Sequence, residues 1–179
     1  MIGYKNSIKT LGVKRKIMGR KSIKADKNIY FRSREEAGLT RAEASEAMVY
    51  VSESRIDKIE NDRTIVQPSD VVAMAQAYKK PSLCNYYCTH ECRIGQDTVA
   101  EIHPSNLAEL SLGIFNSLNA LNAQKERLME IAEDGTIRED EAEDFKKIQE
   151  NLNKISNTIE SLKLWISQSV ADGKIQPLD

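Results

Sequence analysis

The sequence of 179 residues predicts an all-α protein, in which a compact domain of four to five helices precedes a long antiparallel helical hairpin. Between residues 28 and 80, short segments begin with helix-capping residues and are separated by tight turns. From residue 105 onward, leucine and isoleucine recur every three or four residues, as in long amphipathic helices. The predicted parts are a basic arm (1–26), a helical domain (27–83), a cysteine-containing linker (84–104), a hairpin (105–171) and a tail (172–179).

Charge is distributed unevenly along the chain, although the formal net charge is only −1. Residues 1–25 contain eight lysine and arginine residues and no acid. Residues 101–179 contain fifteen acids and eight bases, which is a net charge of −7. A basic arm favours contact with a polyanion. We therefore expect the arm either to become ordered on a phosphate backbone or to remain a solvated tail.

Capping residues mark the first two helices of the domain. A helix is predicted to begin at Asn28 and to end before Gly38, because glycine adopts the left-handed conformation of a helix end at little cost. Thr40 and Glu43 have the spacing of a capping box. A second helix is therefore predicted from Thr40 to about Met48.

Two further helices complete the predicted domain. Ser52 is expected to cap a third helix that continues to Glu60. Pro68 is predicted to open a fourth helix that runs through Tyr78, because proline suits the first helical turn, and Pro81 is predicted to end it. Four short helices with tight turns make a compact all-α domain.

Two apolar series predict the hairpin. Apolar residues recur at intervals of three and four over residues 107–131 and again over 145–166, and a turn sequence at 134–136 separates the two series. We expect two helices of roughly 30 residues, each about 45 Å long at 1.5 Å per residue. A lone hairpin leaves apolar side chains in water, so a homodimer through residues 105–170 is expected.

Residues 34–63 contain the segments REEAGLTRAEAS and VSESRIDKIENDR. Together they resemble the helix-turn-helix of the lambda-repressor/Cro-type (XRE-family) transcription regulators, and the resemblance extends over residues 28–83. It implies that the third helix lies in the major groove of DNA while the second helix holds a phosphate at its N-terminus. This chain departs from the family at Ala44, where a large apolar residue is usual, and at the turn 49–50, which is one residue longer and lacks the usual glycine. The recognition helix is therefore expected to lie at an unusual angle.

The resemblance also implies which residues contact DNA, although each of them is also an ordinary type of surface residue. Three match base-contacting positions, three match phosphate-contacting positions, and Ser52 and Arg55 belong to the same predicted surface. The base-contacting set is Glu53, Ser54 and Lys58. The phosphate-contacting set is Arg41, Asn61 and Arg63. Arg34 and Glu60 match a family ion pair that fixes the geometry of the helices and has a structural role.

Three cysteines and a histidine lie close together in the sequence at Cys84, Cys88, His90 and Cys92. Four such ligands could bind zinc or an iron–sulfur cluster. On one straight helix, however, the first and last cysteine would be about 12 Å apart, so a metal site requires a bend. Buried structural thiols and a redox-sensitive pair are the alternatives. No cofactor is required by any other feature of the sequence.

The sequence therefore predicts a DNA-binding transcription regulator, a repressor that acts as a dimer on an inverted repeat. One alternative is a protein–protein inhibitor or adaptor of a mobile element, of the anti-defence type, and another is a metal- or redox-responsive regulator through residues 84–92. No nucleophile–base set and no phosphate-binding glycine loop occurs, so an enzyme is not expected. No apolar run reaches the roughly 18 residues that span a bilayer. We expect a cytoplasmic protein, bacterial or phage-encoded, with double-stranded DNA as its partner and a further protein partner as a possibility.

Overall fold

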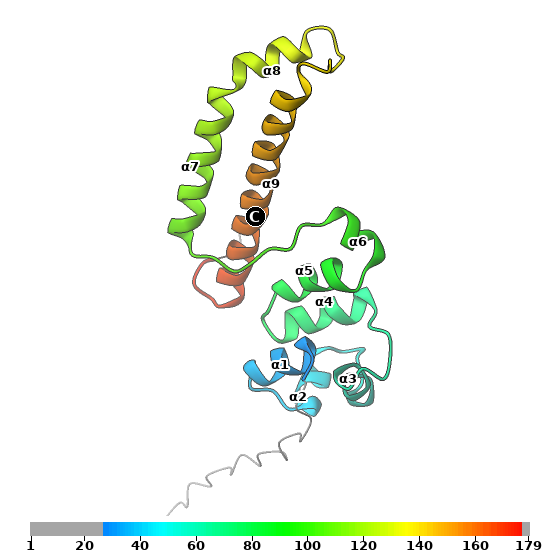
Figure 1. Ribbon diagram of the computed structural model, residues 1–179. Helices are drawn as coiled ribbons and strands as arrows, with labels where there is room; N and C mark the ends of the chain where they lie inside the picture. The colour runs from blue at the N-terminus through cyan, green and yellow to red at the C-terminus, as the bar shows by residue number, and fades with distance from the viewer. Residues whose placement is uncertain (1–26, 177–179) are drawn as a thin grey trace, which may run out of the picture.

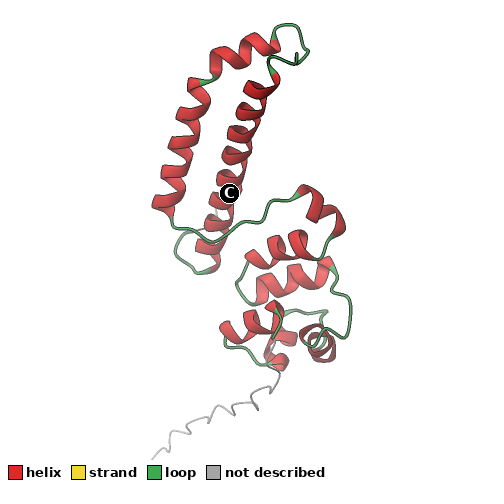
Figure 2. Ribbon diagram, in the orientation of Figure 1, coloured by secondary structure: helices red, strands yellow, loops and turns green. Residues whose placement is uncertain are grey.

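The computed structural model describes residues 27–176, and every regular element in this range is a helix (Figures 1 and 2). The predicted all-α class is confirmed. Helices α1 to α6 form a compact body, and α7 to α9 form an elongated hairpin that extends away from it (Figure 1). The predicted basic arm, 1–26, and the last three residues of the predicted tail lie outside the described residues.

The first four helices begin and end close to their predicted bounds. Their ranges are α1 Ile29–Glu36, α2 Arg41–Ala47, α3 Glu53–Glu60 and α4 Pro68–Ala77. The side chains of Asn28, Thr40 and Ser52 each accept a hydrogen bond from a backbone N–H in the first turn of the helix that follows, and Thr40 and Glu43 form the predicted capping box. Gly38 has φ +70°, as expected of a residue that ends a helix in the left-handed conformation.

The segment after α4 contains two helices that the sequence analysis did not identify. They are α5 Ser82–His90 and α6 Arg93–Thr98. Helix α4 ends at Ala77, and Lys79 turns the chain with φ +53°, so the expectation that Pro81 ends this helix was wrong. Pro81 instead precedes the first turn of α5, where its missing N–H costs no hydrogen bond. Leu83 of α5 is buried in the core, so the cysteine-bearing segment packs on the compact body.

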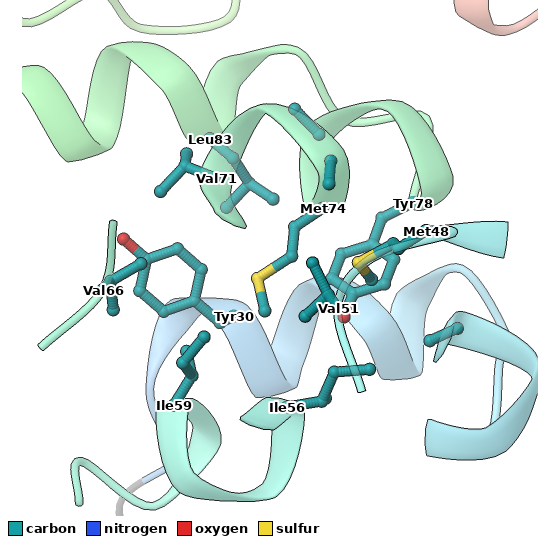
Figure 3. Packing of buried hydrophobic residues seen from close by; sticks show 13 residues of the cluster. Tyr30, Met48, Val51, Ile56, Ile59, Val66, Val71, Met74, Tyr78 and Leu83 are labelled. Atoms are coloured by element: carbon teal, nitrogen blue, oxygen red, sulfur yellow. The ribbon is translucent and has the colours of Figure 1, made fainter. Parts of the chain in front are cut away.

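Helices α1 to α5 all contribute side chains to the core of the body (Figure 3). Ile56 and Ile59 of α3 are almost completely buried and point toward Met74 of α4, as their spacing predicts. Ala44 of α2 is also completely buried. Complete burial of Ile56 and Ile59 fixes which face of α3 remains in contact with solvent.

The hairpin consists of three helices, α7 Leu107–Ala123, α8 Lys125–Ala132 and α9 Ala142–Ala171. The expectation of one continuous first arm of roughly 30 residues was wrong, because the chain leaves helical geometry at Gln124, with φ −104° and ψ 2°. The side chain of Gln124 accepts a hydrogen bond from Asn151 of α9 at 2.7 Å, which holds the break against the second arm. Helix α9 has 30 residues, as expected. Gly135 has φ +71° in the turn between α8 and α9.

Hydrogen bonds connect the hairpin to the compact body near one end. The side-chain amide of Gln168 in α9 donates to the carbonyl of Lys79 at 3.0 Å. Asn85 of α5 donates to the carbonyl of Ala100 and accepts from the backbone N–H of Ile102, both at 3.0 Å. These bonds hold the connection between α6 and α7 and the C-terminal part of α9 next to the compact body.

Replacement of Gly95 by alanine is expected to destabilise the protein. A Cβ atom added at Gly95 would lie 2.1 Å from the carbonyl oxygen of Cys88, so the backbone of α5 or α6 would have to move. We expect the free energy of unfolding to fall by about 1–3 kcal/mol, measured by urea denaturation.

Gly113→Ala is the matched control for this substitution. A Cβ atom at Gly113 would lie 3.4 Å from Cγ2 of Thr158, which is an ordinary contact distance. Alanine also favours the helix by up to about 1 kcal/mol relative to glycine. We therefore expect unchanged or increased stability, and equal losses for the two variants would contradict the role of the close contact between α5 and α6.

Candidate nucleic-acid interface

Helix α3 presents one face to solvent because Ile56 and Ile59 fill the core on its other face (Figure 3). The N-cap residue Ser52 and the helix residues Glu53, Ser54 and Lys58, all predicted to contact DNA, are exposed. Lys58 makes no ion pair or hydrogen bond within residues 27–176 and can therefore donate to an external acceptor. The face of α3 that was predicted to contact DNA is therefore open to solvent.

The position of α3 relative to α1 and α2 depends on the carboxylate of Glu60. Nε of Arg34 lies 2.5 Å from Oε1 of Glu60, and its Nη2 donates to Oε2 at 3.1 Å. Nε of Arg41 donates to the same Oε2 at 2.8 Å. The side chains of Arg34 and Glu60 are 6% and 0% exposed, so the pair lies inside the body. Burial lowers the pKa of Arg34, but the hydrogen bonds to Glu60 and Glu35 and their negative charges together raise it by more, so the net shift is upward.

Arg34 also connects this ion pair to the turn before α2. Its Nη1 donates to the carbonyl of Leu39 at 2.6 Å. The guanidinium lies over the ring of Phe31 at 4.9 Å, a distance at which a cation is attracted to an aromatic face. One buried side chain therefore fixes the end of α1, the entry to α2 and the end of α3.

Three predicted phosphate-contacting residues share one carboxylate, that of Asp57 in α3. Nη1 of Arg41 lies 2.7 Å from Oδ1 of Asp57, and Nη1 of Arg63 lies 3.5 Å from Oδ2. The side-chain amide of Asn61 donates to Oδ1 at 3.1 Å and to the backbone carbonyl of Asp57 at 2.8 Å. Asp57 was not among the residues predicted to contact DNA. Asn61 follows Asp57 by four residues, and this spacing was the one feature of the local sequence that indicated a contact within this network.

Arg55, also predicted to contact DNA, is paired with a residue of the next helix. Its Nε and Nη2 donate to the carboxylate of Asp70 in α4, at distances from 2.5 to 3.2 Å, and its Nη2 also donates to the carbonyl of Ile65. The backbone N–H of Gln67 donates to the same carboxylate at 2.9 Å. Arg55 therefore holds the loop between α3 and α4.

The turn between α2 and α3 leaves two apolar side chains in solvent. Val49 is 93% exposed and has φ +38°, and Tyr50 is 67% exposed. A β-branched residue is strained at positive φ. Val49 therefore has a conformation that glycine would adopt more easily.

The four candidate metal ligands of the linker do not converge. Cys84 and Cys88 are one turn apart on α5, and all three cysteines are free and half-buried. His90 stacks on Tyr86 with 4.3 Å between ring centres, and its Nδ1 lies 3.1 Å from the carbonyl of Tyr86. Within the described range, no group of three or more histidine, cysteine, aspartate or glutamate side chains is placed to hold a metal ion. The residues present do not fit a zinc or iron–sulfur site.

The surroundings of Cys84 do not activate its thiol as a nucleophile. Burial raises its pKa, and the neighbouring Cys88 raises it further. A raised pKa lowers the fraction of thiolate, which is the reactive form.

Comparison with known proteins agrees with the geometry of α1 to α4. Residues 32–81 match a family model described as a helix-turn-helix domain. This class of domain is typical of DNA-binding regulators and is not usually enzymatic. No curated protein and no solved structure matches the chain. Among the described helices, none has the length and apolar character needed to cross a membrane.

The ion pair between Arg55 and Asp70 predicts a dependence of stability on pH. Burial raises the pKa of Asp70, but the hydrogen bonds from Arg55 and Gln67 lower it, and the net shift is downward. The pair therefore stabilises the fold above the ordinary aspartate pKa near 4, and this contribution is lost as the pH falls through the lower pKa of the folded state. Asp70→Asn is expected to lose about 1–3 kcal/mol at pH 7, measured by urea denaturation. The difference from the wild type should shrink below about pH 4.

Asp97→Asn is the control for this prediction. Asp97 pairs with Arg93 at 3.0 Å, but both side chains are well exposed, at 60% and 80%. Such pairs are worth less than about 0.5 kcal/mol. A difference between Asp70→Asn and the wild type that stays constant from pH 7 to pH 3 would contradict the assignment.

Proposed function

We propose that this chain is a sequence-specific DNA-binding transcription regulator of the repressor type, acting as a dimer on an inverted repeat. The observation that carries the proposal is the geometry of α3. Its inner face is buried, its end is fixed by Glu60, and its outer face is exposed. The helix-turn-helix match over residues 32–81 supports the same function.

In the proposed complex, α3 lies in the major groove and three exposed side chains contact bases. Lys58 donates to the acceptor atoms of guanine, and Glu53 accepts from the amino group of cytosine. Ser54 can donate to or accept from either kind of base edge. These roles use the side chains that the core leaves exposed.

The backbone contacts of the proposed complex come from Arg41, Asn61 and Arg63 and from the basic arm. The arm, 1–26, lies outside the described residues, and its eight lysine and arginine residues support the proposal through charge alone. Contacts to phosphates release counterions, so affinity should fall steeply as the salt concentration rises.

Selection of bound sequences from random duplex DNA tests the proposed function, with Lys58→Ala as the informative variant. We expect the wild-type chain to enrich one sequence and Lys58→Ala to lose preference at one base position, at a cost of about 1–3 kcal/mol. Lys147→Ala, an exposed lysine of α9, is the control and should leave the selected sequence unchanged. No enriched sequence with the wild-type chain would contradict the proposed function.

The dimer is proposed from the exposed apolar side chains of the hairpin. Leu107 and Leu118 of α7 are 45% and 49% exposed, and Leu152 and Ile159 of α9 are 44% and 42% exposed. The four lie at the spacing of a helix-packing seam. A second hairpin would cover them in a four-helix bundle, and the two-fold axis would separate two recognition helices by about 34 Å, one turn of DNA.

The chain with both Leu152→Asp and Ile159→Asp is expected to be a monomer. The two charges would lie in the proposed seam, while the well-buried Ile148 still holds α9 in the hairpin. Light scattering at micromolar concentration should give a mass near 20.2 kDa for the variant and twice that for the wild type. Asn153→Asp, a polar and exposed position of the same helix, should remain dimeric. A wild-type mass near 20.2 kDa would contradict the dimer.

A second candidate function is binding of a protein partner through the same domain. Val49 and Tyr50 are exposed beside the start of α3, and the outer face of this helix carries Glu53 and Asp57. Exposed apolar residues beside acidic ones are typical of protein interfaces. The DNA selection distinguishes the two functions, because a protein-binding module would enrich no sequence.

A further inference from the structure

The carboxylate of Asp57 occupies the point on which the proposed phosphate-contacting side chains converge. Arg41 comes from the start of α2, Asn61 from the end of α3 and Arg63 from the turn that follows. All three direct a nitrogen atom at Asp57, with distances of 2.7, 3.1 and 3.5 Å. A phosphodiester group carries the same charge as a carboxylate and accepts hydrogen bonds from the same donors.

These contacts are accessible enough to be exchanged. The side chains of Asp57 and Arg41 are 35% and 30% exposed, and that of Arg63 is 66% exposed. Pairs with this exposure are weak and are screened by salt. The buried pair of Arg34 with Glu60 is different, because both side chains are almost completely buried. An approaching phosphate can therefore replace Asp57 without opening the core.

We propose that Asp57 is an internal counter-ion that competes with the DNA backbone for Arg41, Asn61 and Arg63. The inference rests on the proposed function and adds a determinant of its selectivity. On DNA of random sequence, no base contacts favour the exchange, and the arginines stay with Asp57. On the operator, contacts of α3 with bases bring the backbone close, and the phosphates replace the carboxylate. Asp57 thereby lowers sequence-independent affinity more than operator affinity.

Asp57→Asn tests this inference because asparagine has the same shape but no charge. Binding of the full chain is measured at several salt concentrations, with a random-sequence duplex and with the duplex selected by the wild type. We expect affinity for the random duplex to rise about tenfold at low salt and affinity for the selected duplex to rise less. Because two arginines become free for phosphates, the slope of log affinity against log salt on the random duplex should steepen by about 0.9 for each.

Glu46→Gln is the matched control. Glu46 is an exposed acid of α2 that has no proposed contact with DNA, and it makes no ion pair or hydrogen bond within residues 27–176. Its neutralisation removes the same charge without freeing an arginine, so the salt slope should stay as in the wild type. If Asp57→Asn and Glu46→Gln have equal effects, Asp57 contributes only to the general charge, and the inference is overturned.

Arg63→Gln, made in the wild type and in Asp57→Asn, measures the coupling directly. If Arg63, once released from Asp57, causes part of the increase in affinity, Asp57→Asn should raise the affinity for the random duplex less when Arg63 is absent. Additive effects of the two substitutions would overturn the inference.

Circular dichroism melting checks the fold of each variant, and Asp57→Ser is the second variant if asparagine unfolds the domain. A wild-type chain that binds no DNA overturns the proposed function as well. Selective binding by the wild type with an unchanged Asp57→Asn overturns only the role of Asp57.

Discussion

The buried carboxylate of Glu60 is the contact on which the arrangement of the first three helices depends. Two guanidinium groups, from Arg34 and Arg41, donate to it from two other helices. Removing one partner from such a buried pair is costly, because it leaves a charge inside the protein without compensation. The pair is also directional, since the fork of Arg34 meets both carboxylate oxygens. Apolar packing alone would leave α3 freer to rotate about its axis.

A second, more exposed set of charges lies directly beside this pair. Arg41 belongs to both, since its Nε donates to Glu60 and its Nη1 reaches Asp57. The buried half has a structural role, and the exposed half faces the surface proposed for DNA. One arginine therefore links the stability of the domain to the electrostatics of its proposed binding surface, and its loss would affect both.

Local sequence signals were sufficient for most of the helical body. The caps at Asn28, Thr40 and Ser52 and the turn at Gly38 depend on interactions within a few residues, and they could be predicted from spacing. The break at Gln124 could not, because it depends on a hydrogen bond to Asn151 in another helix. Helices α5 and α6 were missed because their sequence contains few capping signals. Their helical form depends on packing, as with Leu83 in the core and Gly95 against Cys88.

The candidate site shows the same division between local and long-range information. The exposure of Glu53, Ser54 and Lys58 follows from the three- and four-residue spacing of the buried isoleucines in α3. The pairing of Arg55 with Asp70 connects two helices across a loop, and the spacing of the sequence does not indicate it. The resemblance to the family assigns a role to each residue from its position in the sequence. Which of these side chains are free to contact DNA depends on their partners within the protein.

The connection between the hairpin and the body has an evolutionary consequence. The body and the hairpin are joined by residues 99–106 and by a few hydrogen bonds, including that from Gln168 to Lys79. In the proposed dimer, this junction sets the angle between the two-fold axis and each recognition helix. Helix α9 is about 45 Å long at 1.5 Å per residue, so a rotation of about 5° at the junction moves its far end by about 4 Å. Changes at the junction can therefore alter the preferred half-site spacing while α3 is conserved, and changes in α3 can alter the preferred bases while the spacing is kept.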